Sequence, residues 1–421
     1  MSGFDTLKTE VIDRDLCTRC GTCIGICPTG TISYRDGKIA DTGHRCMQCG
    51  MCTAVCPGKE FPMDQWSEKL FCEAYNTGRL FGTYQSIWNA RSTDDHIRRQ
   101  GGSGGVVTQI LLDLLERHVI EGAVTIRDRE DEPWASALCI ADSKEQILAS
   151  ARSKYRIIPV NQVISELKES GKKVAYVGLP CQIQGMRKAM EKNPWLEKQI
   201  VVLISLFCGF NMEEAGTDYL IAKSGIKKED IKTLSYRHKK GEQTGFYLQG
   251  KDGKEFFINK HGYTFLNLLF SPKRCWKCYD YSGEFADIAV GDAWEMGQGF
   301  SRVIVRTKVG KEVFEQAVSR GRIWAEPADE TAIKETQNKV VSYKKRQIGI
   351  RAQRMKHFPD YGVTFETCGG KMRLKGRLLY AVLVFFKNPL GKGLIHFLPF
   401  KCLVKVSEKW KGREVVRRAG K

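Results

Sequence analysis

Two cysteine runs, CTRCGTCIGICP at 17–28 and CMQCGMCTAVCP at 46–57, decide the first part of the fold. Both read C-x2-C-x2-C-x3-C-P, a spacing typical of [4Fe–4S] cubes, each of which needs four thiolates. Three closely spaced cysteines of one run bind one cube, and the fourth, just before the proline, crosses to the other cube. The predicted ligands of cluster I are Cys17, Cys20, Cys23 and Cys56. Those of cluster II are Cys46, Cys49, Cys52 and Cys27.

A pair of zinc knuckles is the alternative, because C-x2-C pairs also bind zinc. Zinc sites do not need the x3-C-P endings, so the spacing favours iron–sulfur clusters. Across residues 10–60 the chain resembles the dicluster ferredoxin family. The segment between the runs, 31–44, predicts a small hairpin that turns at Asp36 and Gly37.

The chain has 421 residues, of which 16 are cysteines. That length allows two to three domains with substantial cores. The N-terminal stretch MSGFDTLKTEVIDRD is polar and lacks the apolar centre of a signal peptide. We therefore expect a cytoplasmic, reducing environment, where clustered thiols indicate metal binding or redox chemistry.

The formal net charge of +19 is concentrated near the C-terminus. Residues 366–421 hold 14 Lys and Arg against 3 Asp and Glu, which leaves +8 for the first 365 residues. Each cube with four thiolates would add a charge of about −2. The body of the protein is then nearly balanced, and its basic character belongs to the tail.

The central segment predicts an α/β fold with a mixed or parallel sheet. Short apolar strands are expected at 123–126, 136–140, 173–177, 200–207, 286–290 and 301–306. Helices are expected between several of them, at 106–118, 181–191 and 212–223. The predicted domains are an α+β ferredoxin-like module at 1–66, an α/β core at 80–320 and a helical, basic tail at 321–421.

A glycine-rich loop, GGSGG at 101–105, leads directly into the predicted helix 106–118. Free amides at the positive end of a helix suit a phosphate or pyrophosphate group. The loop is neither GxGxxG nor a P-loop, and many such loops are plain caps.

Four further cysteines follow predicted strands or form a pair. Cys181 follows the strand KVAYV and Cys208 follows VVLISL, while Cys275 and Cys278 form a C-x2-C pair. Carboxyl ends of neighbouring strands line the crevice where α/β folds bind ligands. Four thiols would suffice for a third cube, and buried structural thiols are the alternative.

Six blocks in order resemble the family of coenzyme F420 hydrogenase/dehydrogenase beta subunits over residues 80–320. They are SGGVVTQILLDLLERHVIEGAV, SKYRIIPV, GLPCQIQGMRKA, FCGF, CWKCYDYSGEFADIAVGDAW and SRVIVRT. The resemblance implies FAD and a core [4Fe–4S] cluster, cluster III, held by Cys181, Cys208, Cys275 and Cys278. It also implies a flavin site at Gly102, Ser103, Gly104, Gly105, Lys154 and Tyr155. Asp287 and Asp292 are expected to be structural.

The implied function is an iron–sulfur flavoprotein oxidoreductase. A hydride-carrying small molecule, F420 or another, would exchange an electron pair at FAD, and the clusters would carry single electrons to or from a redox partner protein. No catalytic acid or base is identified. The alternative is an electron-transfer adaptor that has no substrate of its own and links cellular ferredoxin to a partner enzyme.

The tail contains an apolar run at 378–386, which is too short to span a bilayer. A basic and apolar stretch can lie on an anionic membrane, or it can dock on the core or a partner protein. Peripheral membrane contact is therefore one expectation. Nucleic acid is not an expected partner, because no binding motif accompanies the charge.

Overall fold

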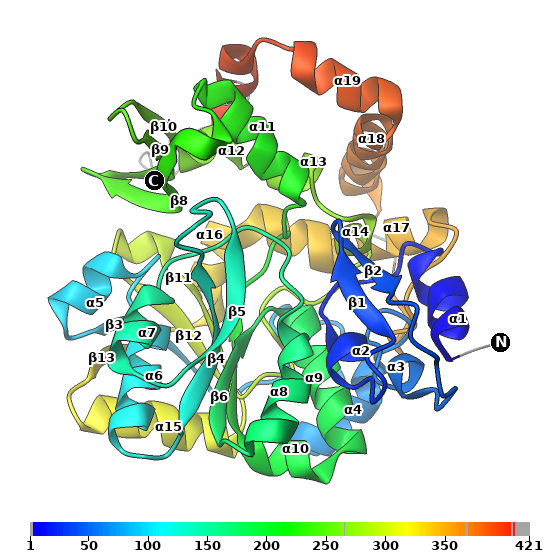
Figure 1. The fold of residues 1–421 in the computed structure, drawn as a ribbon, viewed down its shortest axis with the longest axis vertical. Helices are drawn as coiled ribbons and strands as arrows, with labels where there is room; N and C mark the ends of the chain where they lie inside the picture. The colour runs from blue at the N-terminus through cyan, green and yellow to red at the C-terminus, as the bar shows by residue number, and fades with distance from the viewer. Residues whose placement is uncertain (1–2, 265, 367–368, 406, 409–421) are drawn as a thin grey trace.

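The computed structural model describes residues 3–264, 266–366, 369–405 and 407–408. Its N-terminal module is built from two similar halves (Figure 1, blue). Helices α2 (Thr22–Gly25) and α3 (Met51–Ala54) each begin directly after a glycine with positive φ, 89° at Gly21 and 73° at Gly50. Glycine adopts this left-handed conformation without the steric cost that a Cβ would bring.

The hairpin between the two halves has the predicted turn. Strands β1 (Ile32–Arg35) and β2 (Lys38–Asp41) pair antiparallel around Asp36 and Gly37, whose φ angles are 49° and 74°. Helix α1 (Gly3–Leu7) and the π-helical turn η1 (Lys8–Ile12) supply apolar residues to the small core of the module.

The central domain is organised around a mixed sheet of eight strands in the order β13-β3-β12-β11-β7-β6-β4-β5. Four strands are parallel: β4 (Gly122–Asp128), β6 (Val174–Gly178), β7 (Ile200–Leu206) and β11 (Ile288–Asp292). Four are antiparallel to their neighbours: β5 (Ser136–Ala141), β12 (Ser301–Val305), β3 (Ser86–Ser92) and β13 (Ile323–Pro327). The predicted mixed sheet is confirmed, whereas β3 and β13 were not predicted.

Helices cover both faces of this sheet (Figure 1). One face buries α8 (Val163–Ser170), α9 (Pro180–Lys192) and α10 (Pro194–Gln199), together with α4 (Met63–Phe71) from the end of the N-terminal module. The other face buries α5 (Asp95–Gln100), α6 (Val106–Glu116), α7 (Lys144–Ala149) and α15 (Lys308–Ser319). Apolar side chains from both faces of the strands fill these two cores.

A second, smaller lobe lies above the sheet in Figure 1. It contains the antiparallel strands β8 (Ile231–Lys240), β9 (Gln243–Gly250) and β10 (Glu255–Asn259). Helices α11 (Glu214–Ser224), α12 (Lys260–Tyr263) and α13 (Leu266–Leu269) contribute to its apolar core. The sequence patterns did not predict these three strands.

The C-terminal segment begins with β13 of the large sheet and is then helical, so the region expected to be wholly helical starts as a strand. The helices are α16 (Glu330–Val341), η5 (Ser342–Arg346), α17 (Ile348–Arg354), α18 (Gly370–Lys387) and α19 (Pro389–Phe397). Between α17 and α18 the chain pairs with the N-terminal module. The Phe61 amide donates to the Asp360 carbonyl at 2.7 Å, and the Met63 amide donates to the Tyr361 carbonyl at 2.8 Å.

Candidate functional site

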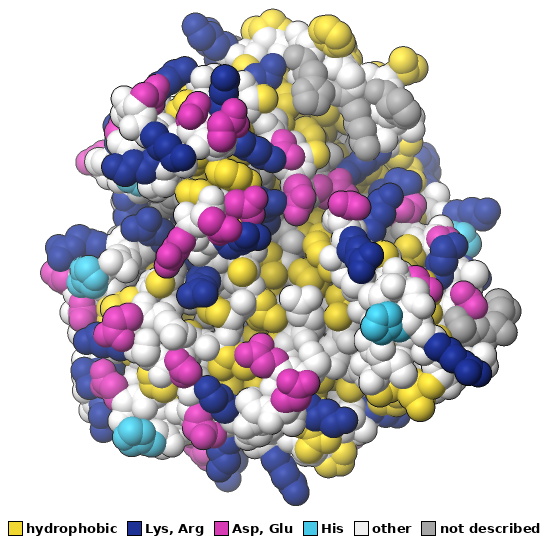
Figure 2. Space-filling view, viewed as in Figure 1, with side chains coloured by type: hydrophobic (Ala, Val, Ile, Leu, Met, Phe, Trp, Pro, Cys, Tyr) yellow, Lys and Arg dark blue, Asp and Glu magenta, His cyan; other side chains and the backbone are white. Residues whose placement is uncertain are grey.

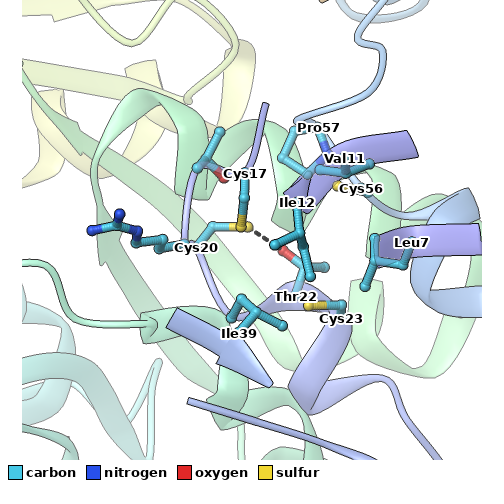
Figure 3. Close-up of a pocket in the computed structure, with 13 residues that line it drawn as sticks. Leu7, Val11, Ile12, Cys17, Cys20, Thr22, Cys23, Ile39, Cys56 and Pro57 are labelled. Carbon is cyan, nitrogen blue, oxygen red and sulfur yellow. Dashed lines mark hydrogen bonds between the residues drawn. The ribbon is translucent and has the colours of Figure 1, made fainter. Parts of the chain in front are cut away.

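A cavity lies beside α2 in the N-terminal module. All four predicted cluster I ligands line it: Cys17, Cys20, Cys23 and Cys56. Figure 3 shows them around the cavity together with apolar side chains such as Leu7 and Ile39. The fold therefore brings the last cysteine of the second run to the first three of the first run.

A second cavity, with the same arrangement, lies beside α3. Its lining includes the four predicted cluster II ligands: Cys27, Cys46, Cys49 and Cys52. The crossing of Cys27 and Cys56 between the halves is the arrangement that the spacing predicts.

The thiols suit a four-iron cube. Across the described residues, no three His, Cys, Asp or Glu side chains converge on one ion position. A cube takes one thiolate at each iron atom, so its ligands surround a cavity. Burial raises the pKa of Cys17 to about 12 and that of Cys56 to about 11, and neighbouring thiols add to both shifts. Thiolates at these positions need a compensating positive charge, which iron would supply.

The part of the N-terminal module that forms the first cavity packs directly against the central domain. In the turn η2 (Val160–Gln162), the Asn161 amide donates to the Cys20 carbonyl at 2.9 Å, and its side chain donates to Thr22 Oγ1 at 2.8 Å. From α9, the buried Lys188 ammonium donates to the Cys56 carbonyl at 3.3 Å. These bonds fix the position of the module against the core.

Gly185 on α9 permits this close seating, because a Cβ there would lie 2.3 Å from Thr22 Oγ1 and 3.4 Å from Cys20 Sγ. We expect Gly185→Val to destabilise the protein by about 2–3 kcal/mol, since Thr22 is buried and cannot move aside. Gly393→Val is the matched control, because a Cβ at this other helical glycine meets nothing within 4 Å. Thermal unfolding of both variants checks the prediction, and equal melting temperatures would contradict it.

The four core cysteines lie together near the carboxyl ends of the central strands β6 and β7. Cys181 is in the first turn of α9, Cys208 follows β7, and Cys275 and Cys278 flank the end of α14 (Lys273–Trp276). The pKa of Cys181 is raised well above its ordinary value by burial and then by the other three thiols and Cys20. The structure thus assembles the predicted third set and places it next to Cys20 of the first cavity.

A buried lysine contacts this third set of cysteines, and the sequence patterns did not predict it. The Lys344 ammonium, from η5, donates to Cys278 Sγ at 3.3 Å. Burial alone would lower its pKa, but the thiols of Cys278, Cys208 and Cys275 raise it. The only local signal is a Lys-Lys pair inside the mostly apolar stretch VVSYKKRQIGI.

The glycine loop lies at the start of α6 as predicted, and Gly105, with φ of 73°, is the N-cap. The Gly104 amide donates to Ser301 Oγ at 2.9 Å, and Ser103 Oγ lies 2.8 Å from the same hydroxyl. A Cβ at Gly102 would approach Ser153 Oγ to 3.0 Å and Arg237 to 3.6 Å. The loop is therefore held close to the strand that carries Arg237.

Lys154 and Tyr155 point to different surroundings. The Lys154 ammonium donates to the carbonyls of Ser150 and Ala151 at 2.9 and 2.6 Å, at the end of α7. Burial lowers its pKa. Tyr155 lies edge-on to Tyr236, and the positive charge of Arg237 partly offsets the increase in its pKa caused by burial. Of these two residues, only Tyr155 lies close to Arg237 and Asp292, the charged residues near the glycine loop.

Arg237 and Asp292 form a buried ion pair beside the loop, which the sequence patterns also did not predict. Arg237 Nη1 lies 2.8 and 3.0 Å from the two Asp292 carboxylate oxygens, and Lys260 lies 3.5 Å from the same carboxylate. Arg237 Nε is buried without a hydrogen-bond partner among the described residues. A buried donor of this kind normally has an acceptor, so the site fits a polar or anionic group.

Comparison with known proteins matches three stretches of the chain to family models. Residues 9–57 match a 4Fe-4S dicluster domain, and 87–165 and 171–331 match the N-terminal and C-terminal parts of the coenzyme F420 hydrogenase/dehydrogenase beta subunit. The beta subunit of the coenzyme F420 hydrogenase of Methanothermobacter thermautotrophicus is 30% identical over 260 residues, which are 60% of this chain and 87% of that protein. The chain belongs to the family of coenzyme F420 hydrogenase/dehydrogenase beta subunits.

Two other relatives agree with this assignment, and one solved structure shares the fold. A subunit of the F(420)H(2) dehydrogenase of Methanosarcina mazei is 28% identical over 76% of this chain and 87% of its own. The coenzyme F420-dependent sulfite reductase of Methanocaldococcus jannaschii is 30% identical over 74% of this chain, but the match spans only 47% of that protein. A chain of the F420-reducing [NiFe] hydrogenase complex from Methanosarcina barkeri shares the fold, with a TM-score of 0.54 and 23% identity over 65% of this chain and 94% of that chain. This member of the family is an iron–sulfur oxidoreductase subunit.

Proposed function

We propose that the protein moves electrons between a two-electron hydride carrier and one-electron partners, through FAD and three [4Fe–4S] clusters. The observation that carries the proposal is the succession of thiol groups. Cys52 of the second cavity lies near enough to Cys23 of the first to raise its pKa, and Cys20 of the first does the same to Cys181 of the core. The three groups thus follow one another from the N-terminal module to the carboxyl ends of β6 and β7.

The glycine loop and Arg237 are the proposed flavin site. Gly102 leaves room for close approach, and the Arg237 Nε donor, which has no partner among the described residues, can bind an acceptor of the cofactor. FAD, when bound, would convert an electron pair received as hydride into single electrons. Asp292 holds the arginine in place by two hydrogen bonds, and the α6 N-terminus favours negative charge.

The proposed substrate is a deazaflavin of the F420 type, because the named relatives are F420 hydrogenase and F420H2 dehydrogenase subunits. Another hydride-carrying small molecule would use the same chemistry. The adaptor hypothesis, in which the chain has no substrate of its own, is not favoured by these matches.

The flavin site is tested by the cofactor content of anaerobically purified protein. We expect one flavin per chain, bleached by reduced F420 or another hydride donor. Gly102→Val should remove the flavin and leave the iron content unchanged, because a larger side chain would press on Ser153 and Arg237. Iron and sulfide without flavin in the wild-type protein would reject the proposal.

Helices α18 and α19 support the proposed peripheral contact with an anionic membrane. Hydrophobic side chains recur at helical spacing on their exposed faces: Leu374, Leu378, Val382 and Phe385 on α18, and Leu390, Leu394 and Phe397 on α19. Leu390 and Phe397 are 84% and 87% exposed, and Figure 2 shows hydrophobic side chains projecting at the top of the molecule, where α19 lies. The surrounding segment 366–421 is strongly basic. None of the described helices has the length and apolar composition needed to cross a bilayer.

We expect the protein to sediment with phosphatidylglycerol vesicles and to be released by salt, because both the apolar stripe and the basic charge contribute to binding. Leu390→Glu combined with Phe397→Glu should reduce the bound fraction at least about tenfold. Val309→Glu, at an exposed apolar residue of α15, is the control. Equal binding to phosphatidylcholine vesicles, or none to either, would contradict the proposal.

A further inference from the structure

Lys344 is a fully enclosed lysine whose ammonium faces the third thiol group. Its relative exposure is 2%, and it donates to Cys278 Sγ at 3.3 Å and to the Asp280 carbonyl at 2.9 Å. The lysine comes from η5, far along the chain from the four cysteines.

The other buried cations of this region have different partners. Lys345, the next residue, pairs with the buried Glu284 carboxylate. Arg274 donates to the Tyr361 hydroxyl at 3.1 Å and to the Pro57 carbonyl at 3.4 Å. Lys188 donates to the carbonyls of Cys56 and Glu60 and lies 3.5 Å from the Glu60 carboxylate. Of these buried cations, only Lys344 donates a hydrogen bond to a core cysteine sulfur.

A cube with four thiolates already has a net charge of about −2 before it accepts an electron. Adding an electron to a buried anionic site is costly, because a low-dielectric interior screens charge poorly. A fixed ammonium next to one ligand sulfur stabilises the reduced form more than the oxidised form. Hydrogen bonds to the sulfurs and local net charge are among the means by which proteins set cluster potentials.

We propose that Lys344 is a positioning residue that raises the reduction potential of the third cluster by holding its ammonium against Cys278. This inference rests on the proposed function, because it requires that Cys181, Cys208, Cys275 and Cys278 hold a cluster. The C-terminal segment thereby completes a redox site whose cysteines all come from the central domain. No bond is made or broken at the lysine.

The test is a potentiometric titration of the anaerobic full-length protein, followed by electron paramagnetic resonance. In Cys278→Ser, one reduction wave of the titration should disappear together with about four iron atoms. That wave belongs to the third cluster. Lys344→Gln should retain all iron and lower the equilibrium constant for reducing that cluster at least about tenfold, which is about 59 mV for one electron. Lys344→Arg keeps the charge and should restore the wild-type wave. Lys334→Gln, which removes an exposed lysine paired with Glu330 on α16, should leave the third wave unchanged.

An unshifted third wave in Lys344→Gln, with iron retained, would overturn the inference and leave the proposed function intact. If Lys344→Gln loses the iron of the third cluster, the iron content and reduction wave of Lys344→Arg distinguish a role of charge from a steric role. Retained iron with a wild-type wave supports the role of charge, whereas loss of iron in this variant too would make the lysine a steric anchor and overturn the inference. If Cys278→Ser keeps all iron and all waves, the proposed third cluster itself is wrong.

Discussion

Cys181→Ser should stop electron transfer from a hydride donor to a one-electron acceptor, with a decrease in rate of at least about 100-fold. Cys181 belongs to the core thiol group and is the member that lies next to Cys20 of the first cavity. On the proposed path, loss of the third cluster would interrupt electron transfer between the flavin and the ferredoxin module. Iron should fall from about 12 to about 8 atoms per chain, since each cube holds four.

Two further expected results make this prediction specific. Bleaching of the flavin by the hydride donor should persist in Cys181→Ser, because the glycine loop and Arg237 are unchanged. Cys139→Ser is the control, since this thiol lies beside Thr125 and Ser150 on β5 and lines neither of the two cysteine-lined cavities. Unchanged acceptor reduction in Cys181→Ser would show that electrons do not pass through the core thiols.

Lys345→Met should destabilise the fold by about 3–5 kcal/mol, because it leaves a buried carboxylate without its partner. Lys345 and Glu284 form an ion pair in which both side chains are 1% exposed. The lysine also lies 3.6 Å above the Tyr279 ring, and Glu284 accepts a hydrogen bond from the Tyr75 hydroxyl. The pair thus joins η5 to the loop between the core cysteines and β11.

Thermal or denaturant unfolding of the anaerobic protein measures this effect. Lys334→Met breaks an exposed ion pair with Glu330 and should cost no more than about 1 kcal/mol. The double variant Lys345→Met with Glu284→Gln should recover part of the lost stability, because no unpaired charge remains. A single Lys345→Met variant as stable as Lys334→Met would contradict this account of the pair.

The sequence predicted features that depend on local spacing. The cysteine runs determine which thiols share a cavity, because short loops bring neighbouring residues together and proline ends each run. The parallel strands β4, β6, β7 and β11 are buried apolar runs, so their composition reveals them. The turn at Asp36 and Gly37 follows from the residues that tolerate positive φ.

Features that depend on contacts between distant segments were not predictable in the same way. Lys344 meets Cys278 across 66 positions, and Arg237 meets Asp292 across 55. Nothing near Arg237 in the sequence distinguishes it from an arginine in solvent, and the only local signal at Lys344 is the Lys-Lys pair within VVSYKKRQIGI. Strands β8 to β10 carry many polar residues because one face of their sheet is open, and this obscured the alternation that identifies a strand. Cys368 lies outside the described residues.

The most direct test of the central claim is a reductive titration of the anaerobically purified wild-type protein with a hydride donor. We predict uptake of about five electrons per chain, two at one flavin and one at each of three clusters. The flavin absorbance and the iron–sulfur absorbance should both bleach during the titration. Uptake of only about four electrons by protein loaded with flavin and two clusters would contradict the third cluster, and the absence of any reduction would contradict the proposed function.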